Sequence, residues 1–203
     1  MPDHDFSHFL TTELDPALLS TPFKVRTNWH VITGAPSSGK TTLINLLKKK
    51  GYKTSQERAH QYIEREMAKG YTVDEVQVDK VALEQAIMAF TLDSELGLAA
   101  SDVIFLDRGL PDCLGYCRIV GLNPNASLPD CFHHRYTSVF ILDWLPFDHD
   151  GVRYEDDTIA AFLHTWTLND YRALGDNPIS VPILPVEECV EFILNKLTEQ
   201  KLI

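Results

Sequence analysis

One stretch constrains the fold of this chain more than any other, because its spacing matches G-x-x-x-x-G-K-[ST] at every fixed position. Residues 29–33 before it read as a short buried strand, and residues 42–47 after it open a helix. A glycine-rich turn between a strand and a helix can wrap its backbone N–H groups around an anion, and the helix N-terminus adds partial positive charge. The stretch therefore predicts a phosphate-binding loop, or P-loop. It consists of Gly34, Ala35, Pro36, Ser37, Ser38, Gly39, Lys40 and Thr41.

The residues of this loop have expected roles toward a nucleoside triphosphate and its Mg²⁺ ion. We expect Lys40 to reach the β- and γ-phosphates and the Thr41 hydroxyl to bind Mg²⁺, with Thr42 completing the nucleotide-binding set. Asp107 closes the apolar run 103–106, where a second metal ligand belongs, facing Thr41. The sequence thus predicts binding of ATP or GTP with Mg²⁺, and a catalytic part for Lys40 and Asp107.

Composition and charge narrow the classes of partner. The chain has 203 residues, 44% of them hydrophobic and 23% charged, which suits one domain with a substantial core. No apolar run approaches the ~20 residues of a membrane span, and the N-terminus lacks the layout of a signal peptide, so we expect a cytoplasmic protein with no membrane partner. A net charge of −11 argues against nucleic acid. The four cysteines lack CxxC spacing and are expected to be reduced core thiols; they are Cys113, Cys117, Cys131 and Cys189.

Expected strands and helices alternate along the chain, which predicts an α/β fold with a parallel sheet covered on both faces by helices. Residues 1–27 form an N-terminal arm, and residues 28–203 form the P-loop domain. Besides the strand before the P-loop, strands are expected at 52–54, 103–106, 138–142 and 179–181. Helices are expected at 56–67, 74–100, 110–120, 159–175 and around 190–197, with an irregular link at 121–135.

Three further charged residues are candidates for catalysis, each with a second interpretation. Glu57 follows an expected strand and could accept the proton of an attacking hydroxyl, or it could only complement a helix dipole. Arg108 could hold an acceptor substrate or form a structural ion pair. Arg153 lies in a polar loop at about 146–157, where it could close over the transferring phosphate as part of a lid. It could equally neutralise its acidic neighbours.

Several short motifs carry a family resemblance. They are Ile32-Thr33-Gly34 with the P-loop, Glu57-Arg58-Ala59, Asp107-Arg108-Gly109 with Asp112 and Tyr116, Asp150-Gly151-Val152-Arg153-Tyr154-Glu155, and Val181-Pro182. In this order, over about residues 28 to 198, the chain resembles the AAA-type predicted ATPase/kinase family, which is similar to NadR-type nucleoside kinases and to the TRPL-translocation-defect protein. The resemblance implies a P-loop NTPase fold with three layers and a five-stranded parallel sheet of order 2-3-1-4-5. It also implies Mg²⁺-dependent binding of ATP or GTP.

Deoxynucleoside and thymidylate kinases resemble the chain more distantly. They carry a glutamate after strand two as the base and an Asp-Arg pair after strand three, which implies these roles for Glu57 and Arg108. One departure from the family pattern is Thr54-Ser55-Gln56 ahead of Glu57, where the family usually has a more apolar strand and a proline.

Three classes of function fit a P-loop chain. The preferred one is a kinase that transfers the γ-phosphoryl group to a hydroxyl or phosphate of a small nucleoside-like or nucleotide-like acceptor. The second is a nucleotide-binding switch that acts through a protein partner, although the nearest match to an N-K-x-D base-reading motif, residues 195–198, lacks the aspartate. The third, a mechanical AAA+ ATPase, is disfavoured because Arg108 stands where such enzymes carry a water-activating glutamate. The acceptor, the choice of ATP or GTP and the oligomeric state stay open.

Overall fold

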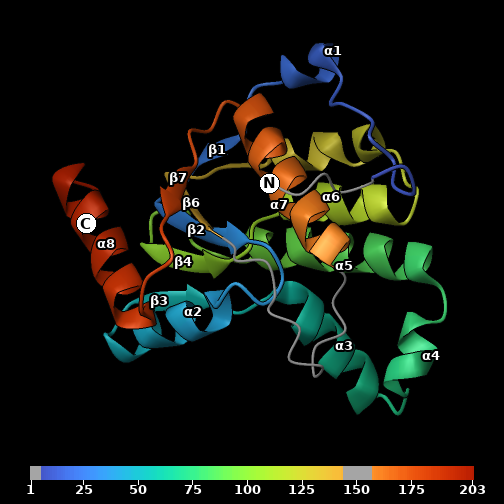
Figure 1. Ribbon diagram of the computed structural model, residues 1–203, viewed down its shortest axis with the longest axis horizontal. Coiled ribbons are helices and arrows are strands. Elements are labelled where there is room, and N and C mark those ends of the chain that lie inside the picture. Colours follow the sequence, from blue (N-terminus) through green and yellow to red (C-terminus); the bar gives the residue numbers. More distant parts are fainter. Residues whose placement is uncertain (1–5, 144–156) are drawn as a thin grey trace.

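Five parallel strands form the central sheet of the molecule (Figure 1). They are β2 (Trp29–Gly34), β3 (Lys53–Ser55), β4 (Ile104–Asp107), β6 (Ser138–Leu142) and β7 (Ile179–Val181). The computed structural model describes residues 6–143 and 157–203. Across the sheet the strands lie in the order β3-β4-β2-β6-β7. Counted along the chain within this sheet alone, that is the expected order 2-3-1-4-5, with β4 beside β2.

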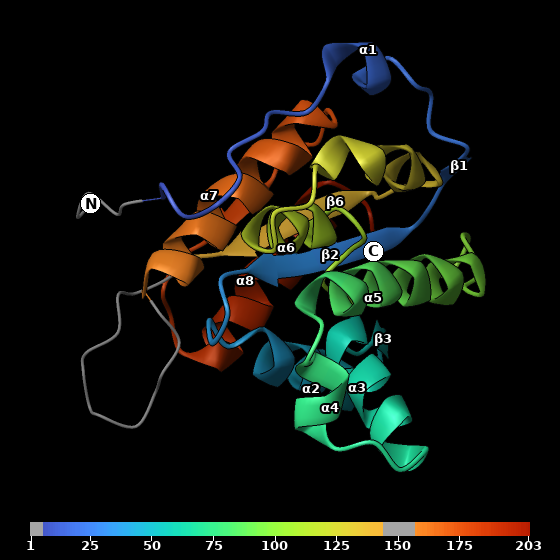
Figure 2. The same cartoon turned by 90° about the vertical axis from the view of Figure 1, so that its right-hand side faces the viewer.

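Helices cover both faces of the sheet. They are α1 (Pro16–Leu19), α2 (Lys40–Lys49), α3 (Arg58–Ala68), α4 (Val73–Gln77), α5 (Lys80–Leu96), α6 (Asp112–Ile119), α7 (Asp157–Ala173) and α8 (Val186–Glu199). Figures 1 and 2 show α2 and α8 on one face, with α5, α6 and α7 on the other. The expected three-layer architecture is therefore confirmed.

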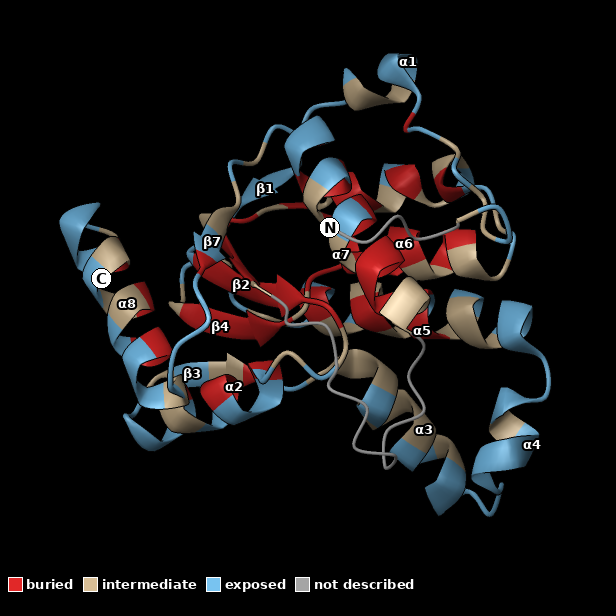
Figure 3. Ribbon diagram, viewed as in Figure 1, coloured by how far each residue is buried: buried red, intermediate tan, exposed pale blue. Residues whose placement is uncertain are grey.

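The three central strands, β4, β2 and β6, are buried on both faces, which explains their largely apolar sequences, whereas the edge strands β3 and β7 are partly exposed (Figure 3). Because successive side chains of a strand point to opposite faces, each strand contributes to two cores. Ile32 and Phe105 pack with the residues of α2 and α8. Val31 and Leu106, their chain neighbours, pack on the other side with Tyr171 of α7. Alternate side chains of one strand therefore pack against the helices on opposite faces of the sheet.

One expected helix is interrupted. The sequence predicts a single helix over residues 74–100, and this is wrong, because α4 ends at Gln77 and α5 begins at Lys80. Between them the Asp79 carboxylate accepts a hydrogen bond of 3.0 Å from the backbone N–H of Ala82. An aspartate that caps the next helix in this way favours an extended backbone at its own position, so the chain turns instead of continuing.

A small sheet that the sequence did not predict joins two distant segments. Strand β1 (Val25–Arg26) pairs in parallel with β5 (His134–Arg135), at the end of the link 121–135. The link also contains two 3₁₀ helices, η1 (Pro124–Ala126) and η2 (Leu128–Phe132). Strands of two residues show no alternation of polar and apolar side chains, so periodicity could not reveal this pairing.

The N-terminal arm packs on the layer formed by α6 and α7. The backbone N–H of Leu10 donates to the carbonyl oxygen of Arg118 at 3.2 Å, and the Arg118 Nε donates back to the carbonyl oxygen of Thr12 at 3.0 Å. The ring of Phe9 lies 4.7 Å, centroid to centroid, from that of Phe162. The arm therefore covers apolar surface that these helices would otherwise expose.

Two observations bear on expectations drawn from composition. All four cysteines are buried free thiols, as expected. In the part of the chain that the structure describes, every helix is too short or too polar to cross a membrane.

Candidate active site

The backbone of the P-loop is shaped by residues that adopt unusual conformations. Gly34 ends β2 with φ of +140°, and a Cβ atom there would lie 2.9 Å from the carbonyl oxygen of Leu142 on the neighbouring strand. Ser37 and Gly39 follow with φ of +59° and +89°. Gly39 precedes α2 and supplies no capping side chain. The first N–H groups of α2 are thereby left to an anion, as a P-loop requires.

Lys40 is folded into this loop. Its Nζ donates to the carbonyl oxygen of Ala35 at 2.6 Å and to the hydroxyl of Ser38 at 3.3 Å, and the residue is only 5% exposed. Burial lowers the pKa of Lys40 to about 7, with a further lowering from the positive charge of Arg108. Phosphate groups in the loop would favour the charged ammonium, so the amine is suited to triphosphate binding.

Thr41 and Asp107 form a pair of oxygen ligands suited to Mg²⁺. The Thr41 hydroxyl donates to Asp107 Oδ2 at 3.0 Å. Thr41 lies in the first turn of α2, after the P-loop that follows β2, and Asp107 ends the neighbouring strand β4. The other carboxylate oxygen, Asp107 Oδ1, is buried and has no hydrogen-bond partner in the described structure. Burial, together with the negative charge of Glu57, raises the pKa of Asp107 to about 6. A bound cation would compensate both the unpaired oxygen and the buried charge.

The oxygen pair also fits what Mg²⁺ needs from a protein. Within residues 6–143 and 157–203 there is no cluster of three or more His, Cys, Asp or Glu able to hold a metal ion. Mg²⁺ in nucleotide sites is held by one or two protein oxygens together with phosphates and waters, so a larger cluster is unnecessary.

Arg108 connects the carboxyl end of β4 to two carboxylates. It adopts φ of +66°, a left-handed conformation that costs a non-glycine residue roughly 1–3 kcal/mol. Its Nε donates to Glu57 Oε1 at 2.9 Å, and its Nη1 donates to Asp112 Oδ1 at 3.1 Å. Burial by itself would lower the pKa of Arg108, but Tyr116, Asp112 and Glu57 together raise it above its usual value. The guanidinium is therefore held charged and in a fixed direction.

Asp112 is the residue of this site that spacing alone did not select as catalytic. Besides Arg108, it accepts hydrogen bonds from the Thr33 hydroxyl, from the backbone N–H of Gly109 at 3.0 Å and from the Tyr171 hydroxyl at 2.8 Å. It is 2% exposed. Its partners come from β2, α7 and the turn after β4, so Asp112 fixes that turn relative to the P-loop strand. An acidic residue in a first helical turn gave only an ambiguous signal for this.

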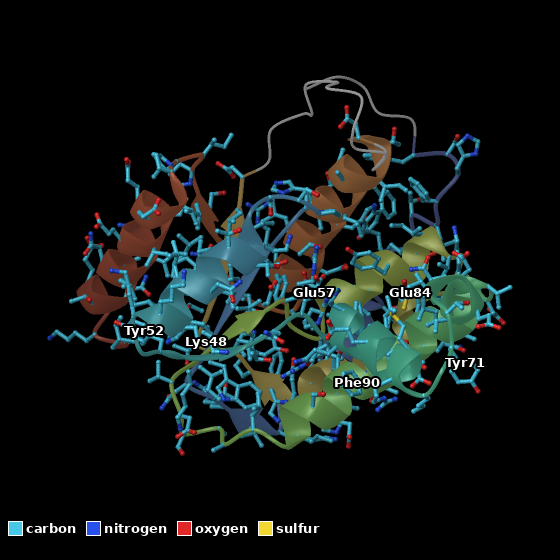
Figure 4. All side chains as sticks on the ribbon, turned by 90° about the horizontal axis from the view of Figure 1, so that it is seen from below. Lys48, Tyr52, Glu57, Tyr71, Glu84 and Phe90 are labelled. Carbon is cyan, nitrogen blue, oxygen red and sulfur yellow. The ribbon has the colours of Figure 1, made fainter. Side chains whose placement is uncertain are left out.

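A cavity of about 90 Å³ lies beside these residues, between α3, α5 and α6. It is lined by Glu57, Arg58, Ala59, Glu84, Ile87, Thr91, Asp107, Arg108, Gly109, Asp112, Cys113 and Tyr116. Glu57, in the segment before α3, and Glu84, on α5, both line this pocket and are labelled in Figure 4. The guanidinium carbon of Arg65 on α3 lies 5.1 Å from the ring centroid of Tyr62 on the same helix and 4.7 Å from that of Phe90 on α5, so this contact fastens α3 to α5.

A larger cavity of about 470 Å³ lies elsewhere, at the amino-terminal ends of β6 and β7, where Arg26 and Arg135 line it. The smaller cavity lies at the carboxyl ends of the strands, which is where ligands of open α/β sheets bind.

The structure thus brings the P-loop residues, Glu57, Asp107 and Arg108 to one edge of the sheet. Arg153 and residues 146–156 of the expected lid lie outside the described residues.

Comparison with known proteins places the chain in a family. The family described as AAA domain matches residues 29–188, which is most of the chain. None of the curated proteins matches the sequence.

Solved structures of similar fold support the architecture. NadR in complex with NR has a TM-score of 0.61 at 18% identity, over 85% of this chain, which spans only 50% of the NadR chain. Deoxyadenosine kinase from M. mycoides has a TM-score of 0.56 at 15% identity, over 84% of this chain and 98% of that one. Thymidylate kinase from Candida albicans has a TM-score of 0.57 at 15% identity, over 87% of this chain and 93% of that one. The P-loop geometry, the strand order and the family match lead to one conclusion: the chain belongs to the AAA domain family and has the fold of P-loop nucleoside and nucleotide kinases.

Proposed function

We propose that this protein is a Mg²⁺-dependent kinase that transfers the γ-phosphoryl group of ATP or GTP to a small nucleoside-like or nucleotide-like acceptor. The observation that carries the proposal is the cavity of about 90 Å³ next to Asp107, which both Glu57 and Arg108 line. A nucleotide switch needs only the triphosphate site, whereas a kinase needs room for an acceptor next to the γ-phosphate. The third class, a mechanical ATPase, has no use for such a pocket.

The residues of the pocket supply the chemistry of transfer. Glu57 Oε1 accepts a hydrogen bond from Arg108, and Glu57 Oε2 has no partner in the described structure, so it is available to a hydroxyl of the acceptor. In the transfer, that hydroxyl gives its proton to Glu57 as its oxygen forms a bond to the γ-phosphorus. The bond from the γ-phosphorus to the bridging oxygen breaks, and the nucleoside diphosphate leaves with both bonding electrons.

The triphosphate side is held by the P-loop. Lys40 would exchange its contacts with Ala35 and Ser38 for contacts with the β- and γ-phosphates, and Thr41 and Asp107 would hold the metal ion. Mg²⁺, when bound, neutralises the charge that builds up on the phosphate oxygens. The rest of catalysis is positioning, in which Arg108 holds Glu57 in a fixed direction.

The similar structures support this class of reaction. They include a deoxyadenosine kinase, thymidylate kinases and a NadR protein in complex with NAD and AMP-PNP. Their names point to nucleosides and nucleotides as the first acceptors to try with this chain.

The test is transfer of labelled phosphate from ATP or GTP to a panel of nucleosides, nucleotides and small polyols. Glu57→Gln keeps the size of the side chain and its contact with Arg108, but it cannot take a proton. We expect transfer to fall roughly 10²–10⁴-fold while nucleotide affinity is retained. Glu64→Gln, an exposed change on α3, is the control and should leave transfer unchanged.

The outcomes separate the base from the class of function. Transfer at the wild-type rate by Glu57→Gln would remove Glu57 as the base and leave the kinase class standing. If the wild type phosphorylates nothing, and a protein partner binds only the triphosphate form, the protein is a nucleotide switch.

A further inference from the structure

The α5 wall of the proposed acceptor pocket contains a carboxylate that the transfer chemistry does not use. Glu84, Ile87 and Thr91 of α5 line the pocket together, at a spacing of three and four residues that places them on one face of the helix. Cys113 and Tyr116 of α6 lie across from them. Glu84 thus lies on the α5 wall of the pocket, whereas Glu57 lines it from the segment before α3.

Glu84 differs from the other carboxylates of the pocket because it has no partner. Arg108 pairs with both Glu57 and Asp112, and Thr41 donates to Asp107. Glu84 forms no hydrogen bond or ion pair with any described residue. The titratable groups that it faces are Cys113, Tyr116 and Cys117, none of which supplies positive charge.

This arrangement has a cost that a structural role would not explain. Burial raises the pKa of Glu84 to about 7, so the environment disfavours its ionised form. Glu84 is only half-buried, so water can reach its carboxylate while the pocket is empty, but a ligand that fills the pocket would displace that water and leave the group without a hydrogen-bond partner unless the ligand supplies one. A ligand group that donates a hydrogen bond, or carries a positive charge, would remove this cost.

The charge of the whole pocket argues for the same kind of ligand. Four carboxylates line it, Glu57, Glu84, Asp107 and Asp112, against the two guanidinium groups of Arg58 and Arg108. The positive charge of Arg108 is already shared between two of the carboxylates. A triphosphate next to the pocket adds further negative charge, so a second phosphorylated ligand would be repelled there.

On these grounds, and resting on the kinase function proposed above, we propose that Glu84 determines the specificity of the acceptor pocket. It selects a nucleoside-like acceptor that is uncharged or cationic, carries no phosphate, and presents a hydrogen-bond-donating or positively charged nitrogen group away from the phosphorylated hydroxyl. The acceptor is therefore a nucleoside rather than a nucleoside monophosphate.

The experiment compares matched acceptors on wild type and Glu84→Gln. The pairs are cytidine with uridine and adenosine with inosine, in which a carbonyl oxygen replaces the exocyclic amino group and the adjacent ring nitrogen gains a hydrogen, together with the monophosphates CMP and AMP. Wild type should favour the amino-bearing member of each pair and leave the monophosphates almost untouched. Because Glu84 would contact the acceptor away from the reacting atoms, Glu84→Gln should raise KM for the amino-bearing acceptors by about 10- to 100-fold and change kcat little.

Two controls test whether the effect of Glu84→Gln is specific to the pocket. Asp93→Asn, an exposed change on the same helix, should leave KM and the preference unchanged. Thermal unfolding of Glu84→Gln tests folding directly, and the variant should be at least as stable as wild type because it removes an unpaired, half-buried carboxylate. A loss of stability together with a uniform loss of activity on all acceptors would overturn the proposal and assign Glu84 a structural role.

A parallel measurement of nucleoside binding by calorimetry, in the presence of ADP and Mg²⁺, separates the two proposals. Amino-selective binding that depends on Glu84, without any transfer, would overturn the kinase function and leave the pocket assignment standing. Transfer that favours monophosphates, or a preference that Glu84→Gln does not change, would overturn the pocket assignment and leave the kinase function standing. If neither nucleosides nor monophosphates bind or are phosphorylated, both proposals fail.

Discussion

At the scale of single residues, the site depends on buried charged groups whose pKa values are displaced from their usual range. Burial has opposite effects on the two sides of the triphosphate site, because it disfavours whichever form is charged. It lowers the pKa of Lys40 to about 7 and raises that of Asp107 to about 6. A phosphate group would favour the protonated form of Lys40, and a Mg²⁺ ion would favour the ionised form of Asp107. Binding near neutral pH should therefore be coupled to proton uptake by Lys40 and proton release by Asp107.

The first residue-scale prediction concerns Asp107 and the metal ion. Asp107→Asn should reduce Mg²⁺-dependent ATP affinity at least tenfold and Mg²⁺-free affinity much less, because only the carboxylate carries charge toward the metal. In wild type the Mg²⁺-dependent part of the affinity should decline as the pH falls through about 6, where Asp107 becomes protonated. Calorimetry with and without Mg²⁺ over pH 5–8 measures both effects. An equal loss with and without Mg²⁺ would assign Asp107 to structure alone.

The second concerns Glu84 and the stability of the protein without ligand. Its pKa of about 7 in the folded chain exceeds the value of 4.5 that describes the unfolded one. The folded state therefore binds more protons between these pH values, and this group makes stability decline as the pH rises from about 4.5 to 7. Glu84→Gln should make the unfolding free energy less dependent on pH over this range, as urea titrations at several pH values would measure. An unchanged slope would contradict a raised pKa at Glu84.

At the scale of elements, α6 and α7 are joined by a buried ion pair as well as by apolar contacts. Arg118 is 0% exposed and forms two hydrogen bonds with the Asp170 carboxylate, of 2.6 and 2.8 Å. Its guanidinium also lies over the ring of Trp166, 4.1 Å from the ring centroid. Because Asp112 begins α6 and Tyr171 lies on α7, this junction also sets the geometry of the turn that carries Arg108.

Removal of one member of this pair should cost far more than removal of both. Arg118→Met leaves the Asp170 carboxylate buried without its partner, and we expect a loss of about 3–5 kcal/mol in unfolding free energy. The double variant Arg118→Met with Asp170→Leu should recover most of that loss, since no uncompensated charge remains. Chemical denaturation of the single and double variants measures the difference. Additive losses would show that the two residues act independently.

At the scale of the whole molecule, the N-terminal arm and the nucleotide site should be separable. The arm contacts α6 and α7 through Phe9 and Leu10, while the P-loop lies at the carboxyl edge of the sheet. Deletion of residues 1–12 should lower the unfolding free energy by about 2–4 kcal/mol, the scale expected for loss of buried aromatic packing, and should leave ATP affinity within about twofold. Thermal unfolding of the truncated chain measures the change in stability, and calorimetry measures its ATP affinity. A loss of ATP affinity with unchanged stability would give the arm a direct part in the site.

Local sequence determined the parts of this protein that depend on neighbours in the chain. The P-loop fits within eight consecutive residues, from Gly34 to Thr41, and its glycine spacing is a backbone requirement that no distant contact can replace. The central strands β2, β4 and β6 are rich in apolar residues. The alternation of strands and helices, and with it the parallel sheet, could therefore also be predicted. Its 2-3-1-4-5 order came from the family resemblance instead, because alternation alone leaves the order of strands open.

Only the tertiary structure decided which distant residues meet. Glu57 and Arg108 are 51 positions apart and form an ion pair, and β1 pairs with β5 over more than a hundred residues. Glu84 is unremarkable on a helix of mixed polarity, and it becomes a candidate for specificity only because α3 and α6 enclose it without a partner. Periodicity reports which face of an element is buried but not which element covers it. The acceptor pocket arises where three helices meet, so its chemistry could be determined only after the chain had folded.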